Sequence, residues 1–501
     1  MRNRFKSVAI SYLQTAVSIL VNLIYAPLLL KFVGQGEYGL YQLVASFFGY
    51  VTLLETSIST GVLKFYCASK AHDKKGMENV LAISRKIYRV FSILLVIVGT
   101  FLITLFCKFY QSSLSEHEVR ESAMMFMALI FNLLITMNNA VYLAAIHANE
   151  RFVFSKSLSI ISQIAQPGVC VLVLIRYPYA LTIVMVQLFV NLIVAFVRYF
   201  YAKNKLDIVV KMHKKDKYMS KNILMFSGQI MMASIADQIF WKTDQLILGK
   251  MYSTVIVAIY AIGAQLYSAY MGVGISISSV FFPKISMLYE KERDSRALSD
   301  LFIKVGQISF CVLFLIFSGF VIFGKEFVHY WVGDEYIKAY YVAVIVMFPF
   351  TIDLIQNMGL SILQVMNKYS FRAKMYFVSA LLNIVSTCIL AKYFDIVGAA
   401  LSTGITLTLT SGVILNIYYI KVGLDISTFW KRILTILVKL LPLTFCSYCI
   451  NKQFFLNCGL FGLCVKIAIY SISYLVCIYY LVLSKNEREG VLKSLHGKLT
   501  K

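Results

Sequence analysis

Apolar runs long enough to cross a lipid bilayer recur along the whole chain. A hydrocarbon core of about 30 Å needs about 17–25 helical residues to span it. Fourteen runs reach that length: 8–30, 39–63, 87–107, 122–146, 157–175, 181–202, 222–249, 255–281, 305–324, 341–366, 375–391, 396–420, 433–450 and 459–483. Charged residues make up only 14% of the chain, against about 25% in soluble domains. The sequence therefore predicts an all-α membrane protein with about 14 transmembrane helices and no soluble domain.

The basic residues indicate which side of the membrane each connection faces, because Lys and Arg are enriched in cytoplasmic loops. A net charge of +24 would suggest a nucleic-acid partner in a polar sequence, but here the cations lie on short connections between spans. With both ends of the chain in the cytoplasm, 34 of the 48 Lys and Arg residues lie in cytoplasmic segments and 9 in the opposite segments. We expect a multi-pass protein of the cytoplasmic (inner) membrane, in contact with membrane lipid and without nucleic acid.

The first run and a few basic residues inside runs need separate interpretation. The run 8–30 follows basic residues, as in a signal peptide, but it has no small-x-small cleavage site, so we expect an uncleaved first span. Arg198 lies near the cytoplasmic end of its run, where a long side chain can snorkel to the membrane surface.

Motifs for catalysis, metal binding or nucleotide binding are not convincing in this sequence. Cys446 and Cys449 form a C-x-x-C, but they lie in the middle of a predicted span, where small apolar packing residues are expected. Gly319-x4-Gly324-Lys325 lacks the Ser or Thr of a phosphate-binding loop and ends a helix instead of opening one. The histidines have no zinc-ligand spacing. We expect no enzyme activity, no cofactor and no metal.

Segments about 217 residues apart are alike. Arg151-Phe152-Val153-Phe154 follows the fourth run, and Lys368-Tyr369-Ser370-Phe371 follows the tenth. This predicts two pseudo-symmetric six-helix lobes around a central cavity. The expected boundaries are an N-terminal lobe 1–202, a basic cytoplasmic linker 203–221, a C-terminal lobe 222–420, and 421–501 with helices 13 and 14 and a cytoplasmic tail. Substrate sites of transporters lie between such repeats, although basic and aromatic loops also recur in multispan proteins without duplication.

Polar side chains form stripes along matching runs, the first with the seventh and the second with the eighth. Polar groups in hydrocarbon are expected to face protein or water, so the stripes predict a shared substrate or ion cavity. The candidate cavity residues are Asn22, Glu55, Asp237, Trp241, Lys242, Asp244, Gln265, Asp353 and Asn357. The alternative for the four acids is pairing with donors inside the helices, and for Lys242 it is snorkelling.

Lys242 is the chief cation among these candidates. Asp237 and Asp244 are two helical turns apart and project on nearly one face, about 10 Å from each other. Lys242 points about 160° away from Asp244 around the helix axis, so we expect no tight pair between them. Lys242 would then be available for an anion that enters the cavity.

Several segments resemble polysaccharide flippases, the Wzx-type O-antigen transporters of the multidrug/oligosaccharidyl-lipid/polysaccharide exporter superfamily. They are Phe32-Val33-Gly34-Gln35-Gly36-Glu37-Tyr38-Gly39-Leu40-Tyr41, Phe323-Gly324-Lys325-Glu326-Phe327, Trp331-Val332-Gly333-Asp334-Glu335-Tyr336 and Phe394-Asp395-Ile396-Val397-Gly398-Ala399-Ala400. The resemblance implies two six-helix lobes around a central cavity lined by helices 1, 2, 7 and 8. It also implies functional acids at Glu55 and at Asp237 or Asp244.

The resemblance further implies a substrate, a polyprenyl-diphosphate-linked oligosaccharide repeat unit. Such a unit is moved from the cytoplasmic to the outer leaflet during lipopolysaccharide or other polysaccharide biosynthesis, by alternating access with H⁺ or Na⁺ as a coupling ion. Glycan polymerase machinery would be the expected protein partner. The alternative function is a drug or cation antiporter of the same superfamily, which acids without bases would favour.

Overall fold

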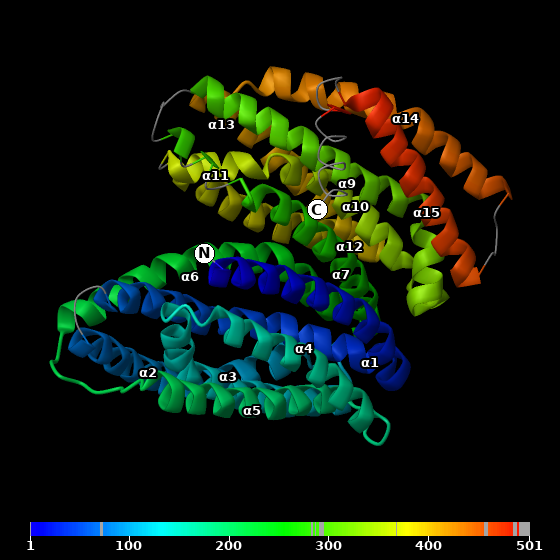
Figure 1. Ribbon diagram of the computed structural model, residues 1–501. Helices are drawn as coiled ribbons and strands as arrows, with labels where there is room; N and C mark the ends of the chain where they lie inside the picture. Colours follow the sequence, from blue (N-terminus) through cyan, green and yellow to red (C-terminus); the bar gives the residue numbers. More distant parts are fainter. Residues whose placement is uncertain are drawn as a thin grey trace. The chain divides into compact units, whose positions relative to one another are not determined.

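The computed structural model of the chain describes residues 2–70, 74–281, 284–285, 287–289, 295–366, 368–454, 459–483 and 488–489. Within these residues every regular element is a helix, as the apolar runs predict. Backbone N–H and C=O groups in lipid have no water to bond, so helices that satisfy their own backbone are the expected structure. Figure 1 shows these helices in their order along the chain.

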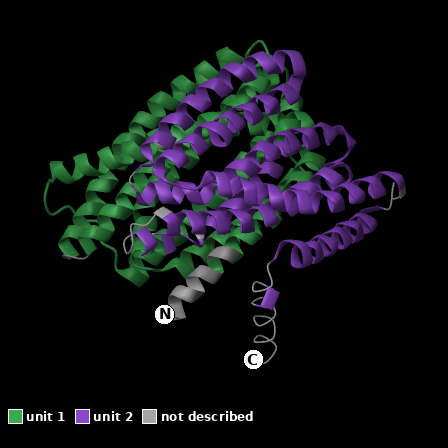
Figure 2. Ribbon diagram, turned by 90° about the horizontal axis from the view of Figure 1, so that it is seen from above, with its two compact units in different colours: residues 1–261 green, residues 262–501 purple. Residues whose placement is uncertain are grey.

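The first of two compact units spans residues 1–261 (Figure 2). Its helices are α1 (Arg2–Lys70), α2 (Lys74–Tyr110), α3 (Glu116–Ala148), α4 (Phe152–Leu174), α5 (Ala180–Leu206), α6 (Lys217–Met251) and the first part of α7 (Thr254–Ser279). α1 packs against α3, α4 and α6, and α3 packs against α2 and α5. The long helix α1 is therefore the common neighbour of most helices in this unit.

The second unit spans residues 262–501. After the end of α7 it contains α9 (Ser295–Val332), η1 (Asp334–Tyr336), α10 (Ile337–Ile355), α11 (Asn357–Val365), α12 (Ser370–Leu407), η2 (Thr408–Ile414), α13 (Leu415–Val422), α14 (Ile426–Phe454), α15 (Gly459–Cys477) and η3 (Ile478–Val482). α9 packs against α10, α14 and α15, and α10 packs against α12.

Twelve helices in the described part of the chain are long and apolar enough to cross a membrane. The sequence predicts fourteen spans. The difference lies in two stretches, Leu13–Lys70 and Ser370–Val422, which each overlap two of the predicted runs. A backbone break interrupts both stretches, at Gly34 (φ 78°, ψ 176°) and at Asp395 (φ 55°, ψ −138°). Glycine suits the first break because it has no Cβ to clash at positive φ. The protein is thus a multi-pass membrane protein.

Two helices, α3 and α6, begin at local capping signals in the sequence. α3 starts with a capping box, in which the Ser115 hydroxyl accepts from the Glu118 N–H at 3.3 Å and Glu118 Oε2 accepts from the Ser115 N–H at 2.8 Å. α6 starts after Asp216, whose Oδ1 accepts from the Met219 N–H at 2.8 Å. Each cap satisfies backbone donors that the first helical turn leaves unpaired.

The two units contain the same pair of stacked rings at equivalent positions. In the first unit Phe154 stacks on Tyr201 with ring centroids 3.6 Å apart, and in the second Phe371 stacks on Tyr418 at 3.9 Å. Both members of the second pair follow their counterparts by 217 residues, the spacing of the sequence repeat. The basic and aromatic segments that resemble each other in sequence therefore make the same contact inside each unit.

Candidate functional site

The residues predicted to line a cavity are distributed over both units. Asn22, Glu55, Asp237, Trp241, Lys242 and Asp244 belong to the first unit, and Gln265, Asp353 and Asn357 belong to the second. Asn22 and Asp237 are exposed, and Trp241 packs edge-on against Phe240 at 4.9 Å. Gln265 on α7 and Asn357 at the start of α11 are half-buried.

Two polar side chains of α6, Gln245 and Thr243, contact α1. The Ser46 hydroxyl donates to Gln245 Oε1, and the Tyr50 hydroxyl lies 2.8 Å from Thr243 Oγ1. The Tyr50 hydroxyl also donates to the carbonyl of Gln238 at 3.4 Å. These bonds give the polar side chains on this part of α6 a packing role, because buried donors and acceptors need partners.

Asp244 is buried, with only 2% of its surface exposed. Its Oδ2 accepts a hydrogen bond from the Tyr260 hydroxyl of α7 at 2.5 Å. This is the pairing with a donor inside the helices that the sequence leaves open for the acids. The contact joins the end of α6 to the start of α7 within the first unit.

Lys242 is half-buried on α6, and the described part of the chain offers it no hydrogen bond and no ion pair. The predicted lack of a Lys242–Asp244 pair agrees with this arrangement. A half-buried ammonium without an acid loses part of its hydration and gains no compensating bond. An anion that reached Lys242 would supply the missing counter-charge.

Glu55 faces a cation that sequence reasoning assigned differently. Arg198 on α5 lies close enough to interact electrostatically with Glu55 on α1, and Tyr88 on α2 lies near the same carboxylate. Arg198 was expected to snorkel to the membrane surface, but its buried Nε and its proximity to Glu55 place it among the helices. The acid on α1 thus gives Arg198 a counter-charge within the first unit, and snorkelling stays a prediction.

Arg85 is a further cation of the first unit, and it lies just outside the apolar run 87–107 that the sequence predicts as a span. The structure places Arg85 inside α2, where its guanidinium donates to the Tyr142 hydroxyl of α3 and lies 5.4 Å from the ring centroid. Tyr142 in turn packs edge-on against Tyr199 of α5 at 5.2 Å. Helix periodicity extended upstream of residue 87 could have found Arg85.

Asp353 in the second unit has two polar neighbours. Its Oδ1 accepts from the Ser411 hydroxyl at 2.6 Å, and Arg372 of α12 lies within electrostatic range. The Arg372 Nη1 donates to the Tyr369 hydroxyl at 3.0 Å, and the guanidinium lies 5.3 Å from the Tyr376 ring centroid. Sequence reasoning assigned Arg372 to a loop and missed it, although it follows the repeated basic and aromatic segment.

Each unit therefore holds cations among its helices, together with acids and aromatic rings. Arg guanidinium groups bind phosphate with paired hydrogen bonds, and Lys supplies a point charge. Charged residues at membrane depth are expensive and usually serve a function. Cations of both kinds can bind the phosphates of an anionic head group.

Comparison with known proteins identifies the family. Residues 5–289, more than half of the chain, match the family described as "Polysaccharide biosynthesis protein". No curated protein matches the chain.

Similar solved structures show the fold. The structure "Lipid II flippase MurJ, inward closed conformation" aligns with a TM-score of 0.75 at 14% identity, over 94% of this chain and 98% of that chain. An inward-facing multidrug resistance MATE family transporter of the MOP superfamily aligns with a TM-score of 0.64 at 13% identity, over 83% and 96%. A MOP superfamily transporter from Pyrococcus furiosus aligns with a TM-score of 0.55 at 13% identity, over 83% and 96%. The chain belongs to the polysaccharide biosynthesis protein family and has the MurJ- and MATE-like fold, as the resemblance to Wzx-type transporters predicts.

Proposed function

We propose that the protein is a flippase that moves a polyprenyl-diphosphate-linked oligosaccharide repeat unit from the cytoplasmic to the outer leaflet. The observation that carries the proposal is the set of cations held among the helices, of which Lys242 has no acid partner in the described part of the chain. A diphosphate requires such cations, whereas an exporter of cationic drugs requires acids without bases. The family match to polysaccharide biosynthesis and the fold similarity to a lipid II flippase support the same substrate class.

We infer that α1 and the α12–α13 stretch each cross the membrane twice, which gives fourteen spans. A helix of 58 residues would be about 87 Å long, far more than the bilayer core of about 30 Å. The repeat supports this count. Position 34 precedes position 251, where α6 ends, by 217 residues, and position 395 follows position 178, in the α4–α5 connection, by the same number.

The same inference gives two lobes, 1–202 and 222–420, joined by the linker 203–221 and followed by 421–501. Both termini and the linker then lie in the cytoplasm, in agreement with the charge bias. The equivalent ring stacks of Phe154 with Tyr201 and of Phe371 with Tyr418 support the duplication.

The physical task is to carry a polar head and two phosphates across an apolar core while the prenyl tail stays in lipid. A cavity open to one leaflet and then to the other performs this task without exposing the phosphates to hydrocarbon. An ion gradient would bias the two states through a titratable acid. Glu55, Asp237 and Asp244 are the candidates for this role, and Asp237 is the most exposed of the three.

Reconstitution into liposomes tests the function. We expect the purified protein to move a labelled polyprenyl-diphosphate-linked sugar across the bilayer, measured as label accessible to an impermeant enzyme on the far side. The matched assay measures efflux of a cationic dye from the same vesicles. Dye efflux without glycan movement would establish the drug antiporter in place of the flippase.

A further inference from the structure

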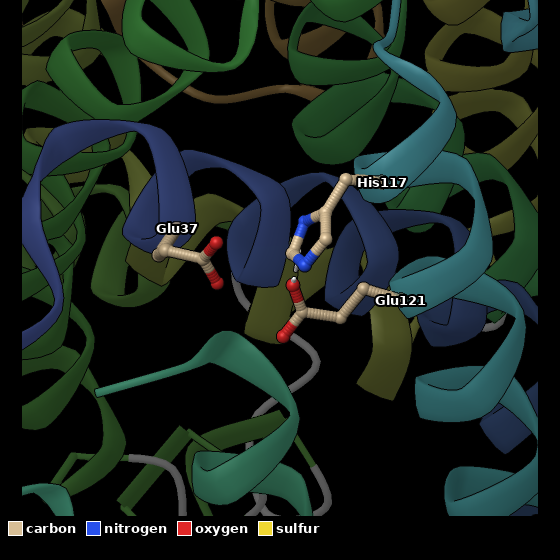
Figure 3. A group of neighbouring side chains, drawn as sticks. All are labelled: Glu37, His117 and Glu121. Atoms are coloured by element: carbon tan, nitrogen blue, oxygen red, sulfur yellow. Dashed lines mark ion pairs between the residues drawn. The ribbon is translucent and has the colours of Figure 1, made fainter. Parts of the chain in front are cut away.

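Three potential metal ligands lie close together near the beginnings of α3 and α5. The one from α1 follows the backbone break at Gly34 by three residues. They are Glu37 of α1 and His117 and Glu121 of α3, and one ligand atom of each lies within 4.8 Å of the other two (Figure 3). His117 Nδ1 is 3.8 Å from Glu121 Oε2. All three residues belong to the first unit.

Backbone donors hold one oxygen of each carboxylate. Glu37 Oε2 accepts from the Ala180 N–H at 2.7 Å, and Glu121 Oε1 accepts from the Leu181 N–H at 2.9 Å. These N–H groups belong to the first two residues of α5 and have no partner within that helix. Carboxylates that bind metals are commonly oriented by such hydrogen bonds, and the second oxygen of each is left for the ion.

The remaining oxygen of Glu121 is buried, and it lies 3.8 Å from His117 Nδ1, beyond hydrogen-bond distance. Glu121 is 3% exposed, and its Oε2 has no hydrogen-bond partner in the described part of the chain. Figure 3 shows this carboxylate below the His117 imidazole, with Glu37 facing both from α1. Two neighbouring carboxylates, one of them buried, need a proton or a cation between them to balance their charge.

We propose that Glu37, His117 and Glu121 bind a divalent transition-metal ion of the zinc type. Zn²⁺ accepts carboxylate oxygens and imidazole nitrogen in one site, whereas Ca²⁺ and Mg²⁺ prefer oxygen alone. The charge of the ion balances that of the two carboxylates. Because ligand atoms around a tetrahedral ion lie about 3.4 Å apart, the ligands must close slightly, and the His117 side chain, 68% exposed, is free to do so.

The surroundings provide a route for the ion. His117 and Glu121 line a cavity of about 720 Å³ together with Arg120, Met124, Val169 and Phe189. Three protein ligands leave a fourth position that water can fill. The bound ion would join α1 to α3 and to the first turn of α5, in a segment close to the break at Gly34.

Metal titration of the purified full-length protein tests the proposal. The background carries Cys446→Ser and Cys449→Ser, so that this thiol pair cannot bind zinc. After treatment with a chelator, we expect one Zn²⁺ per chain with saturable binding and a raised Tm, and Co²⁺ should show the absorption of a tetrahedral site. His117→Ala should weaken zinc binding by about 10–100-fold, and Glu121→Gln should do the same while keeping the acceptor for Leu181 N–H.

Glu116→Gln is the matched control, because Glu116 is exposed on the same helical turn and is not part of the cluster. It should bind zinc like the parent. Equal zinc affinity of parent and His117→Ala, saturation by Ca²⁺ at the same concentration, or a Tm that responds to pH alone would each overturn the proposal. These measurements need no transport, so they succeed or fail independently of the flippase function.

Discussion

The two aspartates of α6 have different surroundings although they lie on one helical face. Asp244 is buried and bonded to Tyr260, whereas Asp237 is exposed. A buried carboxylate with a phenol donor stabilises the contact between α6 and α7. An exposed carboxylate is open to protons and ions. The two carboxylates can therefore be tested separately, one for folding and one for transport.

Replacing these aspartates should give opposite phenotypes. Asp244→Ala removes the acceptor of the buried Tyr260 hydroxyl, which should cost about 1–3 kcal/mol and lower the amount of folded protein in the membrane. Asp237→Asn should leave that amount unchanged and weaken the dependence of export on the ion gradient, because it removes a titratable charge. Membrane immunoblots and export with and without an uncoupler measure both effects. A normal level of Asp244→Ala with lost export would assign Asp244 to transport.

Lys242 offers the sharpest test of anion binding. Lys242→Ala should reduce export of a lipid-linked glycan about tenfold, the loss of one charge-assisted hydrogen bond. Lys242→Arg should retain part of the activity, because a diphosphate needs a cation more than a particular donor shape. Lys205→Ala, an exposed lysine in the last turn of α5, is the control. The measurement is surface glycan in a flippase-null strain at matched protein levels. Full export by Lys242→Ala would contradict anion binding by Lys242, and the snorkelling of this side chain would remain as the explanation of its position.

Glu55 and Asp353 test whether the remaining acids act in transport. We expect Glu55→Ala and Asp353→Ala to reduce export several-fold more than membrane level, because each faces an arginine that a substrate phosphate could bind in its place. Export normalised to the immunoblot signal gives the comparison. If inserted protein and export fall together, the arginine pairs serve folding, since a buried charge left unpaired costs about 3–5 kcal/mol.

At the scale of helices, the packing of the first unit depends on close backbone approach. A Cβ at Gly39 of α1 would lie 1.8 Å from the carbonyl oxygen of Thr254, the first residue of α7. Backbone atoms cannot yield as a flexible side chain can, so only glycine fits at this contact.

Gly39→Ala should therefore destabilise the protein by about 1–3 kcal/mol. Gly36→Ala is the control, because a Cβ there meets nothing nearer than 3.9 Å. The measurement is the midpoint of thermal aggregation in detergent for both variants and the parent. Equal midpoints for Gly39→Ala and Gly36→Ala would contradict the predicted contact.

Helices were predictable because apolar length and the need to satisfy backbone groups both act locally. The sequence also predicts that the apolar runs end before residue 39 and before residue 396, because short polar segments separate them. The backbone breaks at Gly34 and Asp395 lie in these polar segments. Partners were not predictable, since Arg198 meets Glu55 only through packing of α5 against α1. The cluster of Glu37, His117 and Glu121 was not predicted either, because packing brings α1 next to α3. Only the spacing of His117 and Glu121, four residues apart on one helix, indicated that two of these side chains could meet.

At the scale of the whole molecule, the charge bias of the connections predicts the topology. Residue 213 lies between α5 and α6, where His213 Nε2 is 2.7 Å from Glu78 Oε2 near the start of α2. In a chain stripped of native cysteines, His213→Cys should resist an impermeant thiol reagent added to intact cells. Gln111→Cys, exposed between α2 and α3, should react. Labelling of position 213 from outside would contradict the predicted orientation and place the α5–α6 connection on the outer side of the membrane.

The repeated ring stacks also bear on the order of events during synthesis. Phe154 meets Tyr201 and Phe371 meets Tyr418, so each stack closes within its own half of the chain. Ribosomes add about 5–20 residues per second, and the 217 residues between Tyr201 and Tyr418 therefore take about 10–40 s. The first stack can form during that interval without any residue of the second half. The inserting nascent chain can thus complete the last hairpin of one repeat before the translocon receives its counterpart.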